Sequence, residues 1–551
     1  MELLRQRFTT SLEDALDQGP YDFVIVGAGF YGCFVASKLY QLSHPKKPKV
    51  LILEAGDLWL PGHVKQYPFL TPKDLHRIPG VTAQGKVFYG PQDAWIAEKG
   101  YRQTTMVGGH STQWDLWAPR TQPEDFADWP TRIADEVVDA MPAMELEMGL
   151  RPARPFFKGV LQDQLQVQLN RHLDQFSEFD EIRPGPFAAQ GHAEQSGSLA
   201  AGPFCPLSML LETMANDTEG HVKLVTGCRV RRFEISDQRV IGLAVRDNRQ
   251  NRFAEIKIGN RTQVITTAGI RQSTRLFLES LSPRGRGYEQ IGRNLNGHMK
   301  SEFHVRFPKS VLSLPDAQLL PQAALETHGA DSCMQIFAVG GRHESGRPHF
   351  AEPHFEQDRV KQHSVLGDQN MLTLTLVSYT GIAGDNNRIL MEKIANQDVA
   401  NVQAYYRLNK NDLDNWQRHD VLAIKFLQSL IRNHGKKDEL NKVEWKVGQQ
   451  WLSSPPQSAS QVRSPINSVG FECGTLRFSD DPDTGVLNQF GRSNGFANLY
   501  CLDSAAIPST GAGSPVLPTL TWARIATQKL VQQWYKHAMS RPASINGKIF
   551  A

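Results

Sequence analysis

The chain has 551 residues, of which 40% are hydrophobic and 21% charged, and its 60 Lys and Arg against 57 Asp and Glu leave a formal net charge of +3. This composition excludes a disordered or fibrous chain, and the small net charge argues against nucleic acid or an anionic membrane as a partner. The length predicts more than one lobe. We therefore expect a large globular protein that acts on a small molecule.

The N-terminal segment and the cysteines favour a cytoplasmic location. Residues 1–20 carry several charged side chains and no apolar run typical of a secretory signal. The apolar stretch 23–39 contains three glycines and Lys38, so we do not expect it to span a membrane. The six cysteines lack C-x-x-C spacing, which predicts neither a disulfide framework nor a zinc site.

The first chemical motif is a glycine turn between a strand and a helix. Residues 23–26 (Phe-Val-Ile-Val) are typical of a short buried strand, and residues 34–42 repeat apolar side chains at helical spacing. Gly27, Gly29 and Gly32 form G-x-G-x-x-G between them, an arrangement that turns the chain tightly and points helix N–H groups at a pyrophosphate. A glycine triplet alone is a weak signal, because any sharp turn favours glycine.

A second strand strengthens the prediction of a dinucleotide site. Residues 49–53 (Lys-Val-Leu-Ile-Leu) end in Glu54, 22 residues after Gly32, where a carboxylate can accept hydrogen bonds from ribose hydroxyls. No arginine stands next to Glu54 in the sequence, which argues against the 2′-phosphate of NADP. This unit does not decide between NAD and FAD.

Five segments resemble, in order along the chain, the motifs of the glucose-methanol-choline (GMC) family of FAD oxidoreductases, and the second is closest to the pyranose oxidase branch. The segments are 53–56 (Leu-Glu-Ala-Gly), 106–114 (Met-Val-Gly-Gly-His-Ser-Thr-Gln-Trp), 264–278 (a strand, an Ala-Gly turn and a helix), 291–298 (Ile-Gly-Arg-Asn-Leu-Asn-Gly-His), and 498–508 with 518–521 (Pro-Thr-Leu-Thr).

The resemblance implies an α/β fold in which a Rossmann-like FAD-binding domain is interleaved with an α+β substrate-binding domain. The implied FAD-binding parts are residues 1–151, 205–304 and 456–551, and the substrate-binding parts are 152–204 and 305–455. In the second lobe, residues 370–379 alternate as a half-buried strand should, and we expect them to pair with a strand starting at Arg388. Residues 412–432 predict an amphipathic helix.

The resemblance also assigns the residues that hold FAD. Gly108 and Gly109 would let the backbone approach the flavin, and Pro518 suits the first turn of a helix that faces it. The implied cofactor-binding residues are Gly27, Gly29, Tyr31, Gly32, Glu54, Met106, Gly108, Gly109, Ser111, Gln113, Val230, Ala268, Asp503 and Thr519. Gln113 stands where the pyranose oxidase branch has a histidine bonded to flavin, so we expect noncovalent FAD.

The family's catalytic histidine is missing. It precedes a Gly-Thr by three residues, and this chain has Phe471 there. The family's second catalytic position, a His or Asn, is Ser514 or Leu517, depending on the alignment. Three groups are candidates for the base that takes the hydroxyl proton, and each can equally be an ordinary polar residue: Asp115, Glu472 and His110. A reaction without a base is the remaining alternative.

We therefore predict an FAD-dependent oxidase or dehydrogenase that oxidises the CH–OH group of a sugar, glycoside or natural-product intermediate by hydride transfer to flavin N5. The electron acceptor is oxygen or another oxidant. The alternatives are a biosynthetic tailoring enzyme acting on a C–H or C–N bond, a catalytically silent FAD-bound partner protein and, less favoured, an NAD-dependent dehydrogenase. A histidine-rich stretch at 342–363 has irregular spacing, so we expect a surface loop there and no metal site.

Overall fold

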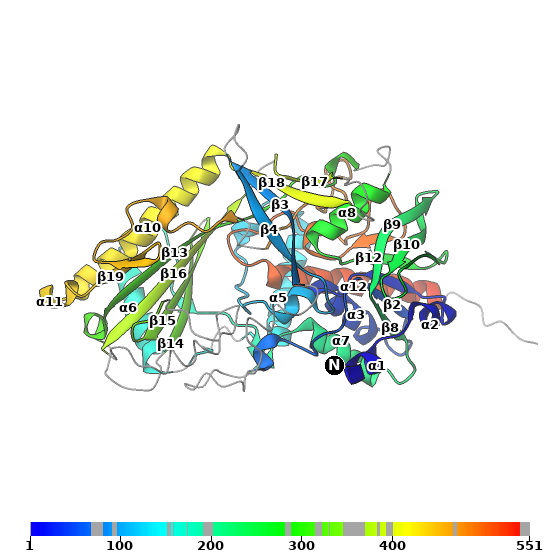
Figure 1. Cartoon of the computed structure of the whole chain (residues 1–551), viewed down its shortest axis with the longest axis horizontal. Coiled ribbons are helices and arrows are strands. Elements are labelled where there is room, and N and C mark those ends of the chain that lie inside the picture. Colours follow the sequence, from blue (N-terminus) through cyan, green and yellow to red (C-terminus); the bar gives the residue numbers. More distant parts are fainter. Residues whose placement is uncertain are drawn as a thin grey trace, which may run out of the picture.

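The structure is a computed structural model. The chain folds into two lobes, and the backbone passes from one lobe to the other several times along the sequence (Figure 1). The structure describes residues 2–67, 81–90, 96–150, 156–157, 159–173, 175–190, 202–281, 288–313, 322–329, 331–344, 370–382, 386–392, 400–466 and 471–539. Most of the predicted histidine-rich loop therefore lies outside the described residues.

A five-stranded parallel sheet forms the centre of the first lobe, which we call the parallel-sheet lobe. Its strand order is β21-β12-β1-β2-β8. Its strands are β1 (Phe23–Val26), β2 (Val50–Glu54), β8 (Val222–Thr226), β12 (Gln263–Thr266) and β21 (Leu499–Cys501). Every residue of β1 and β2 is buried, which explains why these strands have continuous apolar runs instead of alternating ones.

Helices and a small antiparallel sheet surround this parallel sheet (Figure 1). Helix α3 packs against α7 and α12, and α8 packs against β9. The helices are α1 (Glu2–Phe8), α2 (Leu12–Asp17), α3 (Phe30–Gln41), α5 (Thr131–Met148), α7 (Pro206–Asn216), α8 (Ile270–Ser280) and α12 (Val516–Met539). The antiparallel strands are β9 (Cys228–Ser236), β10 (Arg239–Asp247) and β11 (Arg252–Lys257), and a two-stranded sheet pairs β6 (Ala189–Gln190) with β7 (Gly202–Pro203).

The second lobe is built on a seven-stranded antiparallel sheet in the order β20-β19-β13-β16-β15-β14-β5. Its strands are β5 (Arg183–Pro184), β13 (Gly297–Pro308), β14 (Gln322–Gly329), β15 (Ser332–Gly340), β16 (Met371–Ile382), β19 (Glu444–Val447) and β20 (Gln450–Leu452). Its helices are α6 (Val160–Leu173), α10 (Lys410–His434) and α11 (Lys437–Leu440). The predicted helix 412–432 is confirmed as α10, and the domain boundary predicted after residue 304 falls inside β13.

The register of this sheet separates its two faces. Phe303, Leu325, Ile336 and Leu376 form one row across four strands, and they belong to the apolar cluster with α6 and α10. Side chains alternate along a strand, so a row three residues away points to the opposite face. That row is Lys300, Tyr379, Cys333 and His328. We call this side the inner face, because its apolar members join the core of the parallel-sheet lobe.

A four-stranded sheet lies at the junction of the lobes in the order β17-β18-β3-β4. Its strands are β3 (Val81–Gly90), β4 (Ile96–Thr104), β17 (Arg388–Glu392) and β18 (Asn401–Arg407). The expected pairing of residues 370–379 with the Arg388 strand is therefore wrong, because β17 pairs with β18 while β16 pairs with β13 and β15. Strand β16 is also buried on both faces, not on one.

Three further observations concern a turn, the helices and the cysteines. Gly227, with φ at +72°, separates β8 from β9, so Val230 lies in a strand that starts after this glycine and not in one continuous strand with Thr226. Among the described residues, no helix is long and apolar enough to cross a membrane. All six cysteines are buried and free.

Candidate cofactor and active site

The N-terminus of α3 presents open backbone donors. The first hydrogen bond within the helix runs from Cys33 N to Gly29 O at 3.0 Å, so the N–H groups of the preceding turn point out of the helix end. A Cβ placed on Gly29 would meet only Thr267 O, at 3.9 Å. The protein itself therefore leaves room beside Gly29, where an anion can accept these hydrogen bonds.

The other two glycines of the motif serve packing. A Cβ on Gly32 would lie 1.9 Å from Gly27 O, so this glycine allows the helix to sit tightly on the turn. Gly27 has φ at +99°, and its Cβ would lie 2.7 Å from Ala268 Cα in the loop after β12. The structure thus brings the predicted residue Ala268 directly against the glycine turn.

Glu54 closes the turn at the end of β2. Its Oε2 accepts a hydrogen bond from Ala28 N at 2.8 Å and its Oε1 accepts one from Gly56 N at 2.7 Å. Burial raises the pKa of Glu54, and the two backbone donors and the charge of Arg229 oppose this shift. Arg229 comes from β9 and is not adjacent to Glu54 in sequence, so its charge acts on Glu54 through the fold.

The glycine loop after β4 packs against the N-terminus of α3. Gly108 N donates to Ala28 O at 2.7 Å, and a Cβ on Gly109 would lie 3.0 Å from Gly29 Cα. Met106 is fully buried before this loop, and Ser111 Oγ donates to Gly108 O at 2.7 Å.

Gln113, the next predicted residue of this loop, has a buried amide nitrogen with no hydrogen-bond partner within the described residues. A buried donor without a partner is costly, and a bound group can satisfy it.

Asp503 holds the turn before α8. Its Oδ2 accepts hydrogen bonds from Gly269 N at 2.9 Å and Ser273 Oγ at 2.6 Å, and its Oδ1 accepts one from Ala505 N at 2.9 Å. Burial raises the pKa of Asp503, and these donors oppose the shift. Gly269 has φ at +81°, and a Cβ there would meet nothing within 4 Å, which is a second open side beside the glycine turn.

Three remaining residues complete the predicted cofactor set. Tyr31 and Thr519 are neighbours, and burial raises the pKa of Tyr31, an effect that the nearby Thr519 side chain opposes. Val230 lies on β9, where its carbonyl accepts a hydrogen bond from Arg275 Nη2 at 3.1 Å. Arg275 is almost fully buried, and burial lowers its pKa to about 10. This arginine, which fixes the strand at Val230, is missed by motif reading.

These residues fit a flavin adenine dinucleotide. The open helix end suits a pyrophosphate, Glu54 suits ribose hydroxyls, and the unpaired amide of Gln113 and the open side of Gly269 leave polar and steric room nearby. The chain supplies these features from segments that are far apart in sequence.

The three candidate bases occupy different surroundings. Glu472 is paired with Arg271, at 2.7 Å and 3.2 Å, and accepts a hydrogen bond from Tyr406 Oη at 3.2 Å. Asp115 Oδ1 accepts a hydrogen bond from Trp117 N at 3.1 Å. Solvent reaches part of His110, yet the protein around its imidazole lowers the pKa of this histidine, and the charge of Glu472 opposes the shift.

The position of the missing histidine lies next to another histidine. Phe471 has φ at +59°, a left-handed conformation that is unusual for an aromatic residue. Its ring meets His298 edge to face at 6.2 Å. Asn296 and Cys473 exchange backbone hydrogen bonds of 2.9 and 3.1 Å, which brings the two segments together. His298 is 2% exposed, and the sequence motif 291–298 to which it belongs assigns it no role.

The loop before α12 supports one of the two alignments. Leu517 is fully buried in the apolar core of the parallel-sheet lobe. Ser514 precedes the helix, and its Oγ is buried without a hydrogen-bond partner in the described part of the chain. Asp125 holds this loop through Oδ1, which accepts a hydrogen bond from Ala512 N at 3.0 Å. The polar position next to His298 is thus Ser514.

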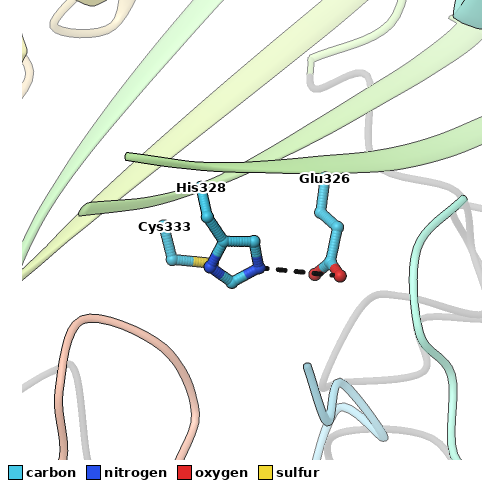
Figure 2. A group of neighbouring side chains, drawn as sticks. All are labelled: Glu326, His328 and Cys333. Atoms are coloured by element: carbon cyan, nitrogen blue, oxygen red, sulfur yellow. Dashed lines mark ion pairs between the residues drawn. The ribbon is translucent and has the colours of Figure 1, made fainter. Parts of the chain in front are cut away.

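A polar cluster lines the inner face of the antiparallel sheet (Figure 2). In Figure 2 the imidazole of His328 lies between the Cys333 thiol and the Glu326 carboxylate, with His328 Nε2 3.7 Å from Glu326 Oε1. Burial lowers the pKa of His328, but the ion pair with Glu326 outweighs burial and the net shift is upward. Burial raises the pKa of the Cys333 thiol well above its usual value.

These three residues offer one carboxylate, one imidazole and one thiol within 4.8 Å of one another, and the predicted absence of a metal stays a prediction. The cluster also lies beside the Ser514 loop, since a Cβ on Gly513 would come 3.9 Å from His328 Cε1.

Comparisons with known proteins concern the family and the fold of the chain. Residues 385–523 match the family model for GMC oxidoreductase, its C-terminal domain. A crystal structure of pyridoxine 4-oxidase from Mesorbium loti is similar, with a TM-score of 0.59 and 18% identity over 94% of this chain and 100% of that chain. At this identity the likeness shows a shared fold. No curated protein matches the chain. The matched domain contains Phe471, Asp503 and Ser514, and it confirms the resemblance on which the assignment of FAD chemistry depends.

Proposed function

This chain is an FAD-dependent oxidoreductase that carries the GMC oxidoreductase C-terminal domain, and we propose that it oxidises the CH–OH group of a small polar molecule. The observation that carries the proposal is the open helix end at Gly29, which has Glu54 on one side and Gly109 on the other. When bound, FAD supplies the acceptor for a hydride from carbon. The polar inner face, with Tyr379, Lys300 and His328, supports a substrate rich in hydroxyl groups.

The chain's own residues would hold FAD without a covalent bond. The N–H groups at the start of α3 would bind the pyrophosphate, and Glu54 and Asp503 would offer carboxylates to hydroxyl groups of the cofactor. Gln113 offers only an amide, which cannot form the covalent link. Acid precipitation of the purified protein tests this. We expect the yellow colour in the supernatant, whereas colour that stays with the pellet would show a covalent link.

The location and the electron acceptor complete the proposal. Six free and buried thiols support a reducing compartment, and we place the protein in the cytoplasm. The acceptor of the reduced cofactor is oxygen or another oxidant.

One observation favours a second function. Phe471 and Ser514 stand at the positions of the family's catalytic pair, and neither of them carries an imidazole. A biosynthetic tailoring reaction at a C–H or C–N bond needs no strong oxygen base, so this enzyme class is the alternative. Asp115, Glu472 and His110 stay proposals for a base, each to be tested by single substitution.

Anaerobic reduction of the bound flavin distinguishes these functions. The holoenzyme is mixed with D-glucose, a methyl glycoside, pyridoxine, benzyl alcohol and benzylamine, and flavin absorbance is followed. Bleaching by a hydroxylated compound supports the proposal, and bleaching by the amine alone supports the tailoring alternative. A flavin that dithionite reduces but no compound bleaches would point to a catalytically silent partner protein.

A further inference from the structure

His298 has one ring nitrogen in a fixed role. Its Nε2 lies 3.0 Å from the carbonyl oxygen of Gly513. A carbonyl oxygen only accepts, so Nε2 carries the hydrogen and Nδ1 of the neutral ring is an acceptor. Gly381 on β16 pairs with His298 on β13, and a Cβ at Gly381 would lie 3.0 Å from Gly511 O. A glycine at position 381 therefore lets the loop at residues 511–513 lie close to this strand pair.

The other ring nitrogen is buried and lacks a hydrogen-bond partner among the residues that the structure describes. The residue is 2% exposed, with the rings of Phe471 and Tyr379 packed edge-on against the imidazole at 6.2 and 6.4 Å. An unpaired acceptor in such surroundings costs free energy unless a ligand donates to it. The position therefore indicates a site for a hydroxyl or amine donor.

The location connects this acceptor with the chemistry of the site. Phe471 occupies the place of the family's catalytic histidine, and its ring lies directly against His298. Ser514, which follows the carbonyl partner Gly513, has a second buried and unpaired polar atom. Two unsatisfied groups thus flank the same short loop, where the family carries its catalytic pair on other residues.

We propose that His298 is the catalytic base of this enzyme, with Nδ1 accepting the substrate's hydroxyl proton. This inference rests on the proposed function. The substrate alcohol loses a hydride from carbon to the bound FAD, which takes both electrons, and loses its hydroxyl proton to His298 Nδ1. The C–O single bond becomes a carbonyl. Ser514 Oγ is placed to hold the substrate oxygen by a hydrogen bond.

The surroundings of His298 agree with proton uptake. Burial lowers the pKa of His298 to about 4, so the ring is neutral at physiological pH and able to accept. The carbonyl groups of Gly513 and Gly511 favour the charged ring, and they would stabilise the imidazolium once the proton arrives. Among the three earlier candidates, Glu472 instead directs both carboxylate oxygens at Arg271.

The first test reads the imidazole directly. Holoenzyme labelled with 15N-histidine is studied by NMR from pH 7 to pH 4, and the His298 signals are assigned by their loss in H298N. We expect a neutral ring protonated on Nε2 that titrates far below the usual histidine pKa. A proton on Nδ1, or a charged ring at pH 7, would overturn the proposal.

The second test compares flavin reduction in two variants. With an alcohol that bleaches the wild-type flavin, we expect H298N to reduce about 10²- to 10⁴-fold more slowly with little change in substrate affinity. The control is H419N. His419 matches His298 in burial, at 4% exposed, and in a pKa that burial lowers to about 4, but it lies on α10 and not on β13. H298Q serves if H298N loses FAD.

The outcomes distinguish a failure of the His298 assignment from a failure of the proposed function. If the wild type is bleached and both His298 variants react at its rate, His298 is not the base and the proposed function stands. If no alcohol bleaches the wild type, the proposed function itself fails, and the role of His298 with it.

Discussion

The ring of Phe471 meets the ring of His298 edge to face, with centroids 6.2 Å apart and planes at 84°. The first residue stands where related enzymes carry their catalytic histidine, and the second brings an imidazole to the same place from strand β13. This contact is the basis of the proposal that His298 replaces the missing histidine as the base.

The second and third glycines of the motif, Gly29 and Gly32, are predicted to differ in whether they tolerate a side chain. Gly29 has φ at −76° and open space on its Cβ side, so G29A should fold normally but retain much less FAD. In G32A the new Cβ would meet Gly27 O at 1.9 Å, so we expect loss of folded protein. Circular dichroism and flavin absorbance per protein measure both. A G29A protein with a full complement of FAD would contradict the role of Gly29.

The backbone of Phe471 is predicted to store strain. At φ +59° a residue with a Cβ is disfavoured and glycine is not, so F471G should unfold with a free energy about 1 kcal/mol higher than F471A. Both variants lose the same ring, which isolates the backbone effect. Denaturant unfolding of the two proteins measures the difference, and an F471A variant as stable as F471G would disprove the strain.

The pair between Arg271 and Glu472 is predicted to be structural. Its side chains are 3% and 11% exposed, so E472A leaves a charge buried and should cost about 3–5 kcal/mol of unfolding free energy. Replacing both residues with leucine should recover most of this loss. The exposed pair Arg132 and Glu136 is the control, since E136A should cost at most about 0.5 kcal/mol. Chemical denaturation of the holoenzymes tests the ordering.

Acid is predicted to destabilise the fold through buried neutral histidines. Burial lowers the pKa of His419 to about 4, so between pH 6.5 and 4 the unfolded chain binds more protons than the folded one. The unfolding free energy should therefore decrease as the pH is lowered, by up to about 1.4 kcal/mol per pH unit for this residue. His63 and His298 act in the same direction, while the raised pKa of His328 acts in the opposite one.

The H419N variant isolates one such contribution, because the titrations of all other groups cancel between it and the wild type. The fall in unfolding free energy from pH 6.5 to pH 4.5 should be smaller in H419N. Equal slopes in the two proteins would show that folding does not lower the pKa of His419.

Local features of the fold could be predicted from sequence, and distant pairings could not. The β1 turn and α10 follow from apolar runs and spacing within one short stretch. The partner of β16 was mispredicted because its alternating pattern does not reveal that apolar layers cover both faces. The charge of Arg229 acts on Glu54 only because β9 lies near β2, and the residues adjacent to Glu54 in the sequence do not indicate this proximity.

The candidate site shows the same division. The residues predicted to hold the cofactor belong to short motifs whose glycines have local geometric reasons, so the sequence alone could propose them, and their roles stay predictions. The proposed role of His298 depends on the meeting of β13, the Phe471 segment and the Gly513 carbonyl, and His298 and Gly513 are 215 residues apart in sequence. Its motif was visible, but its free nitrogen was not.

The most direct test of the account is anaerobic flavin reduction by an alcohol and by the same alcohol carrying deuterium on the reacting carbon. The account predicts that the bound flavin is bleached and that deuterium slows the bleaching several-fold, because the carbon–hydrogen bond breaks as hydride leaves. A flavin that dithionite reduces but that no alcohol, sugar or amine bleaches would contradict it.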